Sequence, residues 1–139
     1  MAVRRQRPLP LIIARELASQ LATATLIADV EGDLVFYNEA AEEILGRTFA
    51  EAGAISASDW GQLFTVEDLE GRPLPLEQMP AGVALLERRP AHGRIHMVGL
   101  DGARRLISVT AIPLYASQTE LVGVMALFWQ GADAELDGA

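Results

Sequence analysis

The segment Leu121–Trp129 limits the possible folds of this chain most strongly, because none of its nine residues carries a polar or charged side chain other than the indole of Trp129. A strand with one face in water alternates apolar and polar residues, whereas a strand covered on both faces does not. The preceding segment Leu106–Ile112 alternates only weakly. We therefore expect a β-sheet that is covered on both faces.

Two groups of helices are available to cover such a sheet. The central helices can cover one face. For the other face the candidates are a helix from Leu9 to about Ala22, a second subunit, or both. In this N-terminal helix Ile13, Leu17 and Leu21 recur every four residues and form an apolar stripe.

The order of the predicted elements points to an antiparallel sheet with a helical insertion. Strands at 26–30 and 34–37 flank the turn 31–33. Asn38 is placed to cap a helix over 39–45, which Gly46 ends. Residues 47–76 are mostly irregular, and a second helix is expected over 77–89. Three strands follow, at 94–100, 104–112 and 121–129, with an Asp-Gly hairpin turn between the first two. Hairpins on both sides of a helical insertion are typical of an α+β fold.

Composition excludes several classes of function. The 139 residues include no cysteine, which excludes disulfides, thiolate metal sites, cysteine nucleophiles and a cysteinyl–flavin adduct. The net charge of -8 argues against binding to nucleic acid. No apolar run approaches the roughly 20 residues of a membrane-spanning helix, so we expect no membrane association.

The region from Asp29 to Gly46 resembles the opening of a PAS domain, with an acidic residue, a glycine turn, a strand ending in Asn38 and a short helix ending in glycine. Gly71–Pro75, Met79-Pro80, Asp101-Gly102 and Leu121–Gly123 continue the resemblance over roughly residues 20–130. It implies a five-stranded antiparallel sheet curved around a pocket, with helices on one face and an N-terminal flanking helix. We accordingly divide the chain into an arm and helix (1–22), a PAS domain (23–130) and a flexible acidic tail (131–139).

The same resemblance implies a cytoplasmic sensory and dimerisation module of a bacterial signal-transduction or regulatory protein, and not an enzyme. The effector domain or partner protein is expected outside this chain. Ser108 and Thr110 share one face of a strand with Leu106, and either place hydroxyls in the pocket wall or bond to neighbouring backbone. The residues expected to line the pocket are Phe36, Ile44, Phe64, Leu85, Ile95, Met97, Leu106, Ser108, Thr110 and Met125.

Three other interpretations remain open from the residues. His92 or His96 could serve a small-molecule enzyme on an α+β cone, with a carboxylate as partner. A haem would need His96 to reach into the pocket, and a flavin could stack on Trp60, Phe64, Phe36 or Tyr37. We expect no bound cofactor. We also expect no metal, because two histidines four residues apart on a strand lie about 13 Å apart, too far to share one ion. Asn38 is either a helix cap or a ligand contact.

The N-terminal helix gives the expectation about assembly. A helix of this length is marginal in water unless it packs against something. Its stripe of Ile13, Leu17 and Leu21 therefore either folds onto its own sheet or meets the helix or sheet of a second copy. We expect a homodimer that uses this helix and the sheet face.

Overall fold

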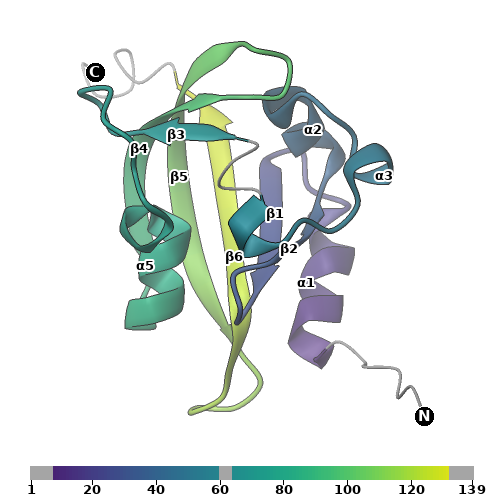
Figure 1. Cartoon of the computed structure of the whole chain (residues 1–139). Helices are drawn as coiled ribbons and strands as arrows, with labels where there is room; N and C mark the ends of the chain where they lie inside the picture. The colour runs from purple at the N-terminus through teal and green to yellow at the C-terminus, as the bar shows by residue number, and fades with distance from the viewer. Residues whose placement is uncertain (1–7, 60–63, 132–139) are drawn as a thin grey trace, which may run out of the picture.

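The sheet is antiparallel, and its strands are ordered β2-β1-β6-β5-β4-β3 (Figure 1). The structure, a computed structural model, describes residues 8–59 and 64–131. Within these residues the strands are β1 (Ala24–Asp29), β2 (Leu34–Tyr37), β3 (Thr65–Glu67), β4 (Ala91–Val98), β5 (Arg104–Tyr115) and β6 (Leu121–Gln130). The last strand, β6, pairs with β1 and β5 and so lies at the centre of the sheet.

The helices cover the two faces of the sheet unequally. The helix α1 (Leu9–Ala18) contacts β1, β2, β5 and β6 on one face. The helices α2 (Glu39–Leu45), α3 (Phe49–Ala52) and α5 (Pro80–Glu87), with the 3-10 turn η1 (Leu76–Gln78), belong to the insertion between β2 and β4. Figure 1 shows α1 at one side of the molecule and α5 at the other, with the strands between them.

Local sequence signals set the ends of α2. The side chain of Asn38 accepts a hydrogen bond from the backbone N–H of Ala41, as an N-terminal cap does. Gly46 ends the helix in the left-handed conformation, with φ +86°, where a glycine carries no steric penalty. Both ends agree with the prediction from the sequence.

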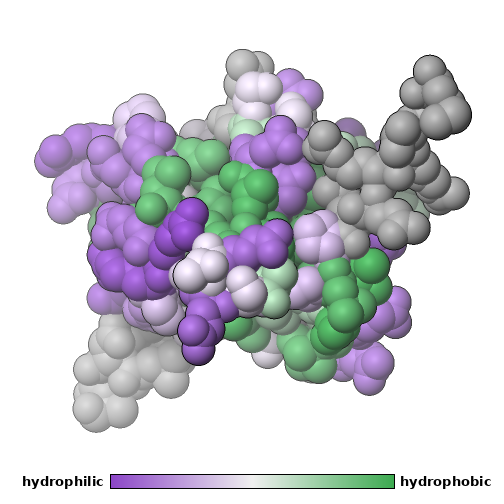
Figure 2. Space-filling view, turned by 90° about the horizontal axis from the view of Figure 1, so that it is seen from below, coloured by the Kyte–Doolittle hydropathy of each residue, from purple (hydrophilic) through white to green (hydrophobic). Residues whose placement is uncertain are grey.

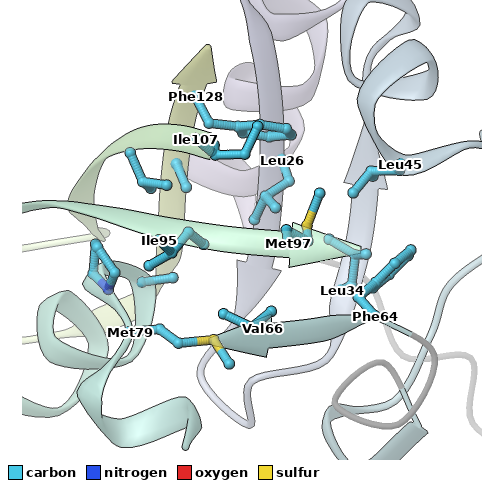
Figure 3. Close-up of a pocket in the computed structure, with 14 residues that line it drawn as sticks. Leu26, Leu34, Leu45, Phe64, Val66, Met79, Ile95, Met97, Ile107 and Phe128 are labelled. Carbon is cyan, nitrogen blue, oxygen red and sulfur yellow. The ribbon is translucent and has the colours of Figure 1, made fainter. Parts of the chain in front are cut away.

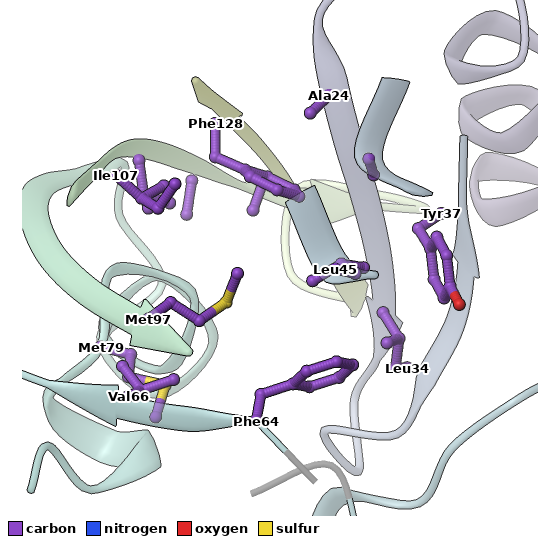
Figure 4. Close-up of a cluster of buried hydrophobic side chains, with 14 of the residues drawn as sticks. Ala24, Leu34, Tyr37, Leu45, Phe64, Val66, Met79, Met97, Ile107 and Phe128 are labelled. Carbon is purple, nitrogen blue, oxygen red and sulfur yellow. The ribbon is translucent and has the colours of Figure 1, made fainter. Parts of the chain in front are cut away.

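The core is divided by the sheet into two clusters, which confirms that both faces are covered. Val124, Ala126 and Phe128 of β6 pack into the larger cluster, between the sheet and the inserted helices (Figure 4). Met125 packs into the smaller cluster, together with Leu11, Ala14 and Ala18 of α1, and Leu127 packs against it. Opposite side chains of one strand therefore fill different cores, which explains why β6 has no polar face.

Two expectations about the elements need correction. The sheet has six strands rather than five among the described residues, because Thr65–Glu67, in the stretch expected to be irregular, pairs with the end of β4. The helix expected over 77–89 is divided into η1 and α5 at Met79-Pro80. Proline lacks an N–H group and disfavours the helical conformation of the residue before it.

Candidate functional site

A partly open cavity of about 60 Å³ lies between the sheet and the inserted helices (Figure 3). Its walls come from β1, β2, β3, the three strands β4–β6, the end of α2 and the start of α5. The residues that line it are Leu26, Leu34, Leu45, Phe64, Val66, Met79, Pro80, Ala81, Ile95, Met97, Ile107, Val109, Ala126 and Phe128. All of these side chains are apolar.

The alternation of side chains along the strands and the close packing of α5 against η1 position the residues of this wall. Ile95 and Met97 are two residues apart on β4, so they point to the same face, as Ile107 and Val109 do on β5. The helix α5 lies tightly against η1, because a Cβ atom on Gly82 would lie 1.7 Å from the carbonyl oxygen of Leu76. Glycine at this position therefore allows Met79 and Pro80 to close the cavity.

The apolar wall restricts the kinds of molecule that the cavity can bind. No lining side chain can donate a conventional hydrogen bond or carry a charge, so an ion or a strongly polar molecule would lose its hydration without compensation. The volume is a fraction of the roughly 300–1,000 Å³ of pockets that hold drug-sized ligands. The cavity accommodates an uncharged, apolar molecule of few atoms, and a flavin or a haem would require the lining side chains to move apart.

Only part of the predicted lining comes together here. Phe64, Ile95 and Met97 line the cavity. Ile44 is buried in the same cluster and Leu85 packs against that cluster, but neither reaches the cavity. The remaining candidates lie on the opposite face of the sheet. Met125 belongs to the smaller cluster and Phe36 packs against it, while Leu106, Ser108 and Thr110 alternate with the cavity-lining residues of β5.

The two hydroxyls predicted for the pocket wall therefore face away from this cavity. Thr110 Oγ1 lies 2.8 Å from Nδ1 of His92, and Ser108 is 3% exposed on the same face. Sequence reasoning missed Ile107 and Val109, the neighbours of these residues that do line the cavity. The alternation of side chains along the strand could have identified them. In the predicted hairpin, Ile107 and Val109 fall on the same face of the sheet as the strongly apolar Ile95 and Met97.

Neither histidine faces the cavity. His92 and His96 lie on the same face of β4, opposite to Ile95 and Met97. The ring of His92 is 6.1 Å from that of Trp129, and Nδ1 of His96 is buried with no hydrogen-bond partner among the residues that the structure describes. The idea that His96 reaches inward to bind a haem is therefore wrong for this structure. Within residues 8–59 and 64–131 no group of three or more His, Cys, Asp or Glu side chains is arranged to hold a metal ion.

The aromatic side chains considered for flavin stacking are dispersed. Phe36 packs edge-to-face with Phe49, at 5.3 Å between ring centroids, and the guanidinium of Arg15 lies 4.7 Å from the centroid of Phe36. The ring of Tyr37 also packs against Phe49. Phe64 alone lines the cavity among the candidates that the structure describes, and Trp60 lies outside the described residues.

Asn38 is a structural residue, as the cap interpretation predicted. It is 2% exposed, and its Oδ1 accepts hydrogen bonds from the N–H groups of Thr25 and Ala41, both at 3.0 Å. Its Nδ2 donates to the carbonyl oxygens of Ala18 and Thr23, both at 2.9 Å. One side chain thus joins the end of α1, the start of β1 and the start of α2, and it does not line the apolar cavity.

The predicted interface residues divide between two sides of α1. Ile13 is 57% exposed and Leu17 is 54% exposed, whereas Leu21 is half-buried against the smaller cluster. The helix therefore folds back onto its own sheet through Leu11, Ala14 and Ala18. Leu9 and Ile12 are exposed as well, so α1 carries a second apolar face that nothing in the described chain covers.

Comparison with known proteins agrees with this architecture. A family model described as a PAS domain matches residues 15–76. No curated protein matches the chain. In the described residues no helix is long and apolar enough to cross a membrane.

Several solved structures share the fold. The PAS domain of BvgS from Bordetella pertussis is 22% identical, with a TM-score of 0.57, and the match covers 92% of this chain and 91% of that one. The LOV protein of Rhodobacter sphaeroides is 15% identical, with a TM-score of 0.68, over 94% and 74% of the two chains. The PAS domain of nitrogen regulation protein NR(II) from Vibrio parahaemolyticus is 19% identical, with a TM-score of 0.55, over 84% and 96%. The match to the family model over residues 15–76 and the shared fold together show that the described chain has the fold of a PAS domain.

Proposed function

We propose that this chain is a non-catalytic sensory and dimerisation module whose apolar cavity binds a small, uncharged, apolar molecule. The observation that carries the proposal is the wall of the cavity, which consists of apolar side chains from six strands and two helices. Cavities of this character stay dry and take up apolar guests. Binding there would press on Ile107 and Val109 of β5 and on Phe128 of β6, strands that also contact α1 on their opposite face.

The proposed dimer uses the exposed face of α1. Leu9, Ile12, Ile13 and Leu17 are large apolar residues exposed on one short helix. A groove of about 320 Å³ lies beside them, lined by Leu11, Ile12, Arg15, Glu16, Ile27, Val35 and Phe36. Figure 2, a view from below, shows hydrophobic residues at the surface in patches between hydrophilic ones. A surface that carries both projecting side chains and a groove can complement itself about a two-fold axis.

The alternative functions receive less support. An enzyme would hold a histidine against a carboxylate in an open polar cleft, whereas in the described chain His92 bonds to Thr110 and Nδ1 of His96 has no hydrogen-bond partner. A haem- or flavin-binding sensor needs a larger cavity than about 60 Å³ and an inward-facing ligand. We therefore expect the purified protein to be colourless.

The cellular setting is also a proposal. We take residues 23–130 as the sensory domain, residues 1–22 as the flanking arm and helix, and residues 131–139 as an acidic tail. We place the module in the cytoplasm of a bacterium, where it controls an effector domain or partner protein outside this chain, such as a transcription regulator. Neither nucleic acid nor membrane is expected to bind it directly.

The cavity is tested with xenon, which is apolar and small. Methyl resonances of Ile95, Ile107 and Val109 should shift as xenon pressure rises, whereas those of Leu11 and Val122, in the smaller cluster, should shift much less. Ala126→Val should reduce the shifts by filling the cavity while leaving the fold intact. If the lining methyl groups respond no more than those of the smaller cluster, the cavity does not bind apolar guests and the proposal fails.

A further inference from the structure

The groove of about 320 Å³ beside α1 is a second concave site, on the opposite face of the sheet from the apolar cavity. Figure 1 shows α1 beside β1 and β2, and β2 is the outermost strand at this edge of the sheet. The groove and the cavity share no lining residue. Most of the groove lining is apolar and comes from both the helix and the strands, namely Leu11, Ile12, Ile27, Val35 and Phe36.

Two charged residues of α1 also line the groove, and they occupy different positions in it. Residues four apart on a helix lie on the same face, one turn apart. Arg15 follows Leu11, which is 3% exposed against the sheet, whereas Glu16 follows Ile12, which is 46% exposed. The side chain of Arg15 therefore starts near the floor of the groove, and that of Glu16 starts at its outer rim, in water.

The guanidinium of Arg15 is held in place by aromatic rings. It lies 4.7 Å from the centroid of Phe36 and 5.7 Å from that of Phe49. A guanidinium over the face of a ring keeps its N–H groups available for hydrogen bonds. In the part of the chain that the structure describes, the guanidinium makes no hydrogen bond and no ion pair with a carboxylate. The groove therefore contains a positioned cation whose charge is not neutralised by a neighbour.

These features fit a small molecule with an apolar body and one negative charge. The planar fork of a guanidinium matches the two oxygens of a carboxylate. A single cation, with Glu16 at the rim, favours a singly charged head over a phosphate. Ile27 and Val35 would cover a hydrocarbon body, since ligand sites combine mostly apolar walls with a few polar groups. The volume is at the lower end of the roughly 300–1,000 Å³ of ligand pockets, which suits a body of several carbons.

We propose that the groove between α1 and β2 binds a carboxylate with a short hydrocarbon body, with the carboxylate on Arg15 and the body against Ile27 and Val35. Ile13 and Leu17 do not line the groove, so the site depends neither on dimerisation through them nor on the apolar cavity. A molecule bound there would join the middle of α1 to the edge strand of the sheet.

Titration of the whole chain with octanoate, followed by methyl NMR, tests this proposal. Resonances of Ile12, Ile27 and Val35 should shift and saturate, whereas those of Ile95 and Val109, in the apolar cavity, should not. Octan-1-ol has the same body without the charge, and it should bind at least about fivefold more weakly because it cannot form a charge-assisted pair with the guanidinium. Shifts in the cavity without shifts in the groove would overturn the proposal.

Variants of the two charged residues separate the site from general electrostatics. Arg15→Gln should weaken octanoate binding by about five- to tenfold, and Arg15→Lys should lose less, because the charge remains but the planar fork does not. Arg72→Gln makes the same change in net charge at an exposed arginine outside the groove, and it should leave binding unchanged. Glu16→Gln should strengthen binding, because it removes a negative charge from the rim. Thermal unfolding verifies that each variant is folded.

Three results would contradict the site. The first is equal affinity for octanoate and octan-1-ol, or equal affinity of Arg15→Gln and the unmodified chain for octanoate. The second is weaker binding by Glu16→Gln, which would indicate a zwitterion rather than a carboxylate alone. The third is a shift of the same groove methyl groups when protein concentration rises without octanoate. That shift would assign the groove to a second copy, and it would leave the proposed dimer intact.

Discussion

The side-chain amide of Asn38 donates a 2.9 Å hydrogen bond to the carbonyl oxygen of Ala18, the last residue of α1. Because the same side chain caps α2 and bonds to both ends of the Thr23–Thr25 segment, the flanking helix is fixed to the sensory core at one buried point. Any movement of α1 relative to the sheet has to break or carry this contact.

Replacement of Asn38 by alanine should therefore destabilise the domain by about 2–4 kcal/mol, since it removes a helix cap and leaves buried backbone groups unpaired. Asn38→Asp keeps the acceptor for Thr25 and Ala41 but replaces the donor to Ala18 and Thr23 by a buried carboxylate oxygen that faces two carbonyl oxygens, and should cost at least as much. Urea unfolding followed by circular dichroism measures both. A clearly smaller loss for Asn38→Asp would mean that the donor side of Asn38 contributes little to the stability.

Two glycines with similar backbone conformations should respond differently to alanine. Gly46 and Gly102 have φ of +86° and +82°, so alanine costs about 1–2 kcal/mol at either from backbone strain. At Gly46 a Cβ atom would also lie 2.6 Å from the backbone nitrogen of Asp101, whereas nothing lies within 4 Å at Gly102. Gly46→Ala should be clearly the more destabilising in thermal unfolding, and an equal loss would contradict the close packing of α2 against the β4–β5 turn.

Replacement of Arg88 by glycine should make the domain more stable. Arg88 is the one described non-glycine residue with positive φ, at 57°, where it ends α5. Arg88→Gly should stabilise the domain by up to about 1 kcal/mol, because glycine adopts this conformation without strain. The hydrogen bond from the Tyr115 hydroxyl to the carbonyl oxygen of residue 88 should survive. Arg88→Val should destabilise, and guanidinium unfolding should rank the three proteins in that order.

Ionisation of Tyr37 should lower the stability of the domain at alkaline pH. Burial of its ring raises the pKa of its phenol above 10.0, and the hydroxyl donates to the carbonyl oxygen of Arg47 at 2.9 Å. The folded state therefore favours the neutral phenol, so this stabilisation is complete below pH 10 and is lost as pH rises towards the folded pKa. The loss has a slope of at most about 1.4 kcal/mol per pH unit. Unfolding free energies between pH 9 and 11 should fall less steeply in Tyr37→Phe than in the unmodified chain.

Local signals explain the parts of the fold that could be predicted. Asn38 and Gly46 act within a few residues, as a cap and a left-handed terminator, and the sequence alone placed α2 correctly between them. The apolar β6 required two covered faces, and the structure has them. These predictions needed no knowledge of which other segments pack nearby.

The face of α1 that meets the sheet could not be predicted, because it depends on a residue of a distant strand. Ile13 and Leu17 form the larger apolar stripe in the sequence, yet Leu11, Ala14 and Ala18 face the sheet. Leu11 fits there because residue 123 of β6 is a glycine, at which a Cβ atom would lie 2.8 Å from Leu11 Cδ2. This close approach becomes apparent only when the two distant segments meet.

The cavity was misassigned for a related reason. β5 alternates only weakly, so hydrophobicity alone did not show whether Ser108 or Val109 faces the larger cluster. The register with β4 decides this, because Ile95 lies opposite Ile107. The hydroxyls of Ser108 and Thr110 were expected in the pocket wall, and the pairing places them on the other face of the sheet.

The oligomeric state in sedimentation equilibrium tests the central proposal, a sensory module that dimerises through α1, most directly. The unmodified chain should be a dimer at micromolar concentration, and Ile13→Glu with Leu17→Glu should be a folded monomer, since both side chains point away from their own sheet. Leu86→Glu, at an equally exposed apolar residue on α5, is the matched control and should remain dimeric. An unmodified chain that is monomeric at high micromolar concentration, or a double variant that stays dimeric, would contradict the account.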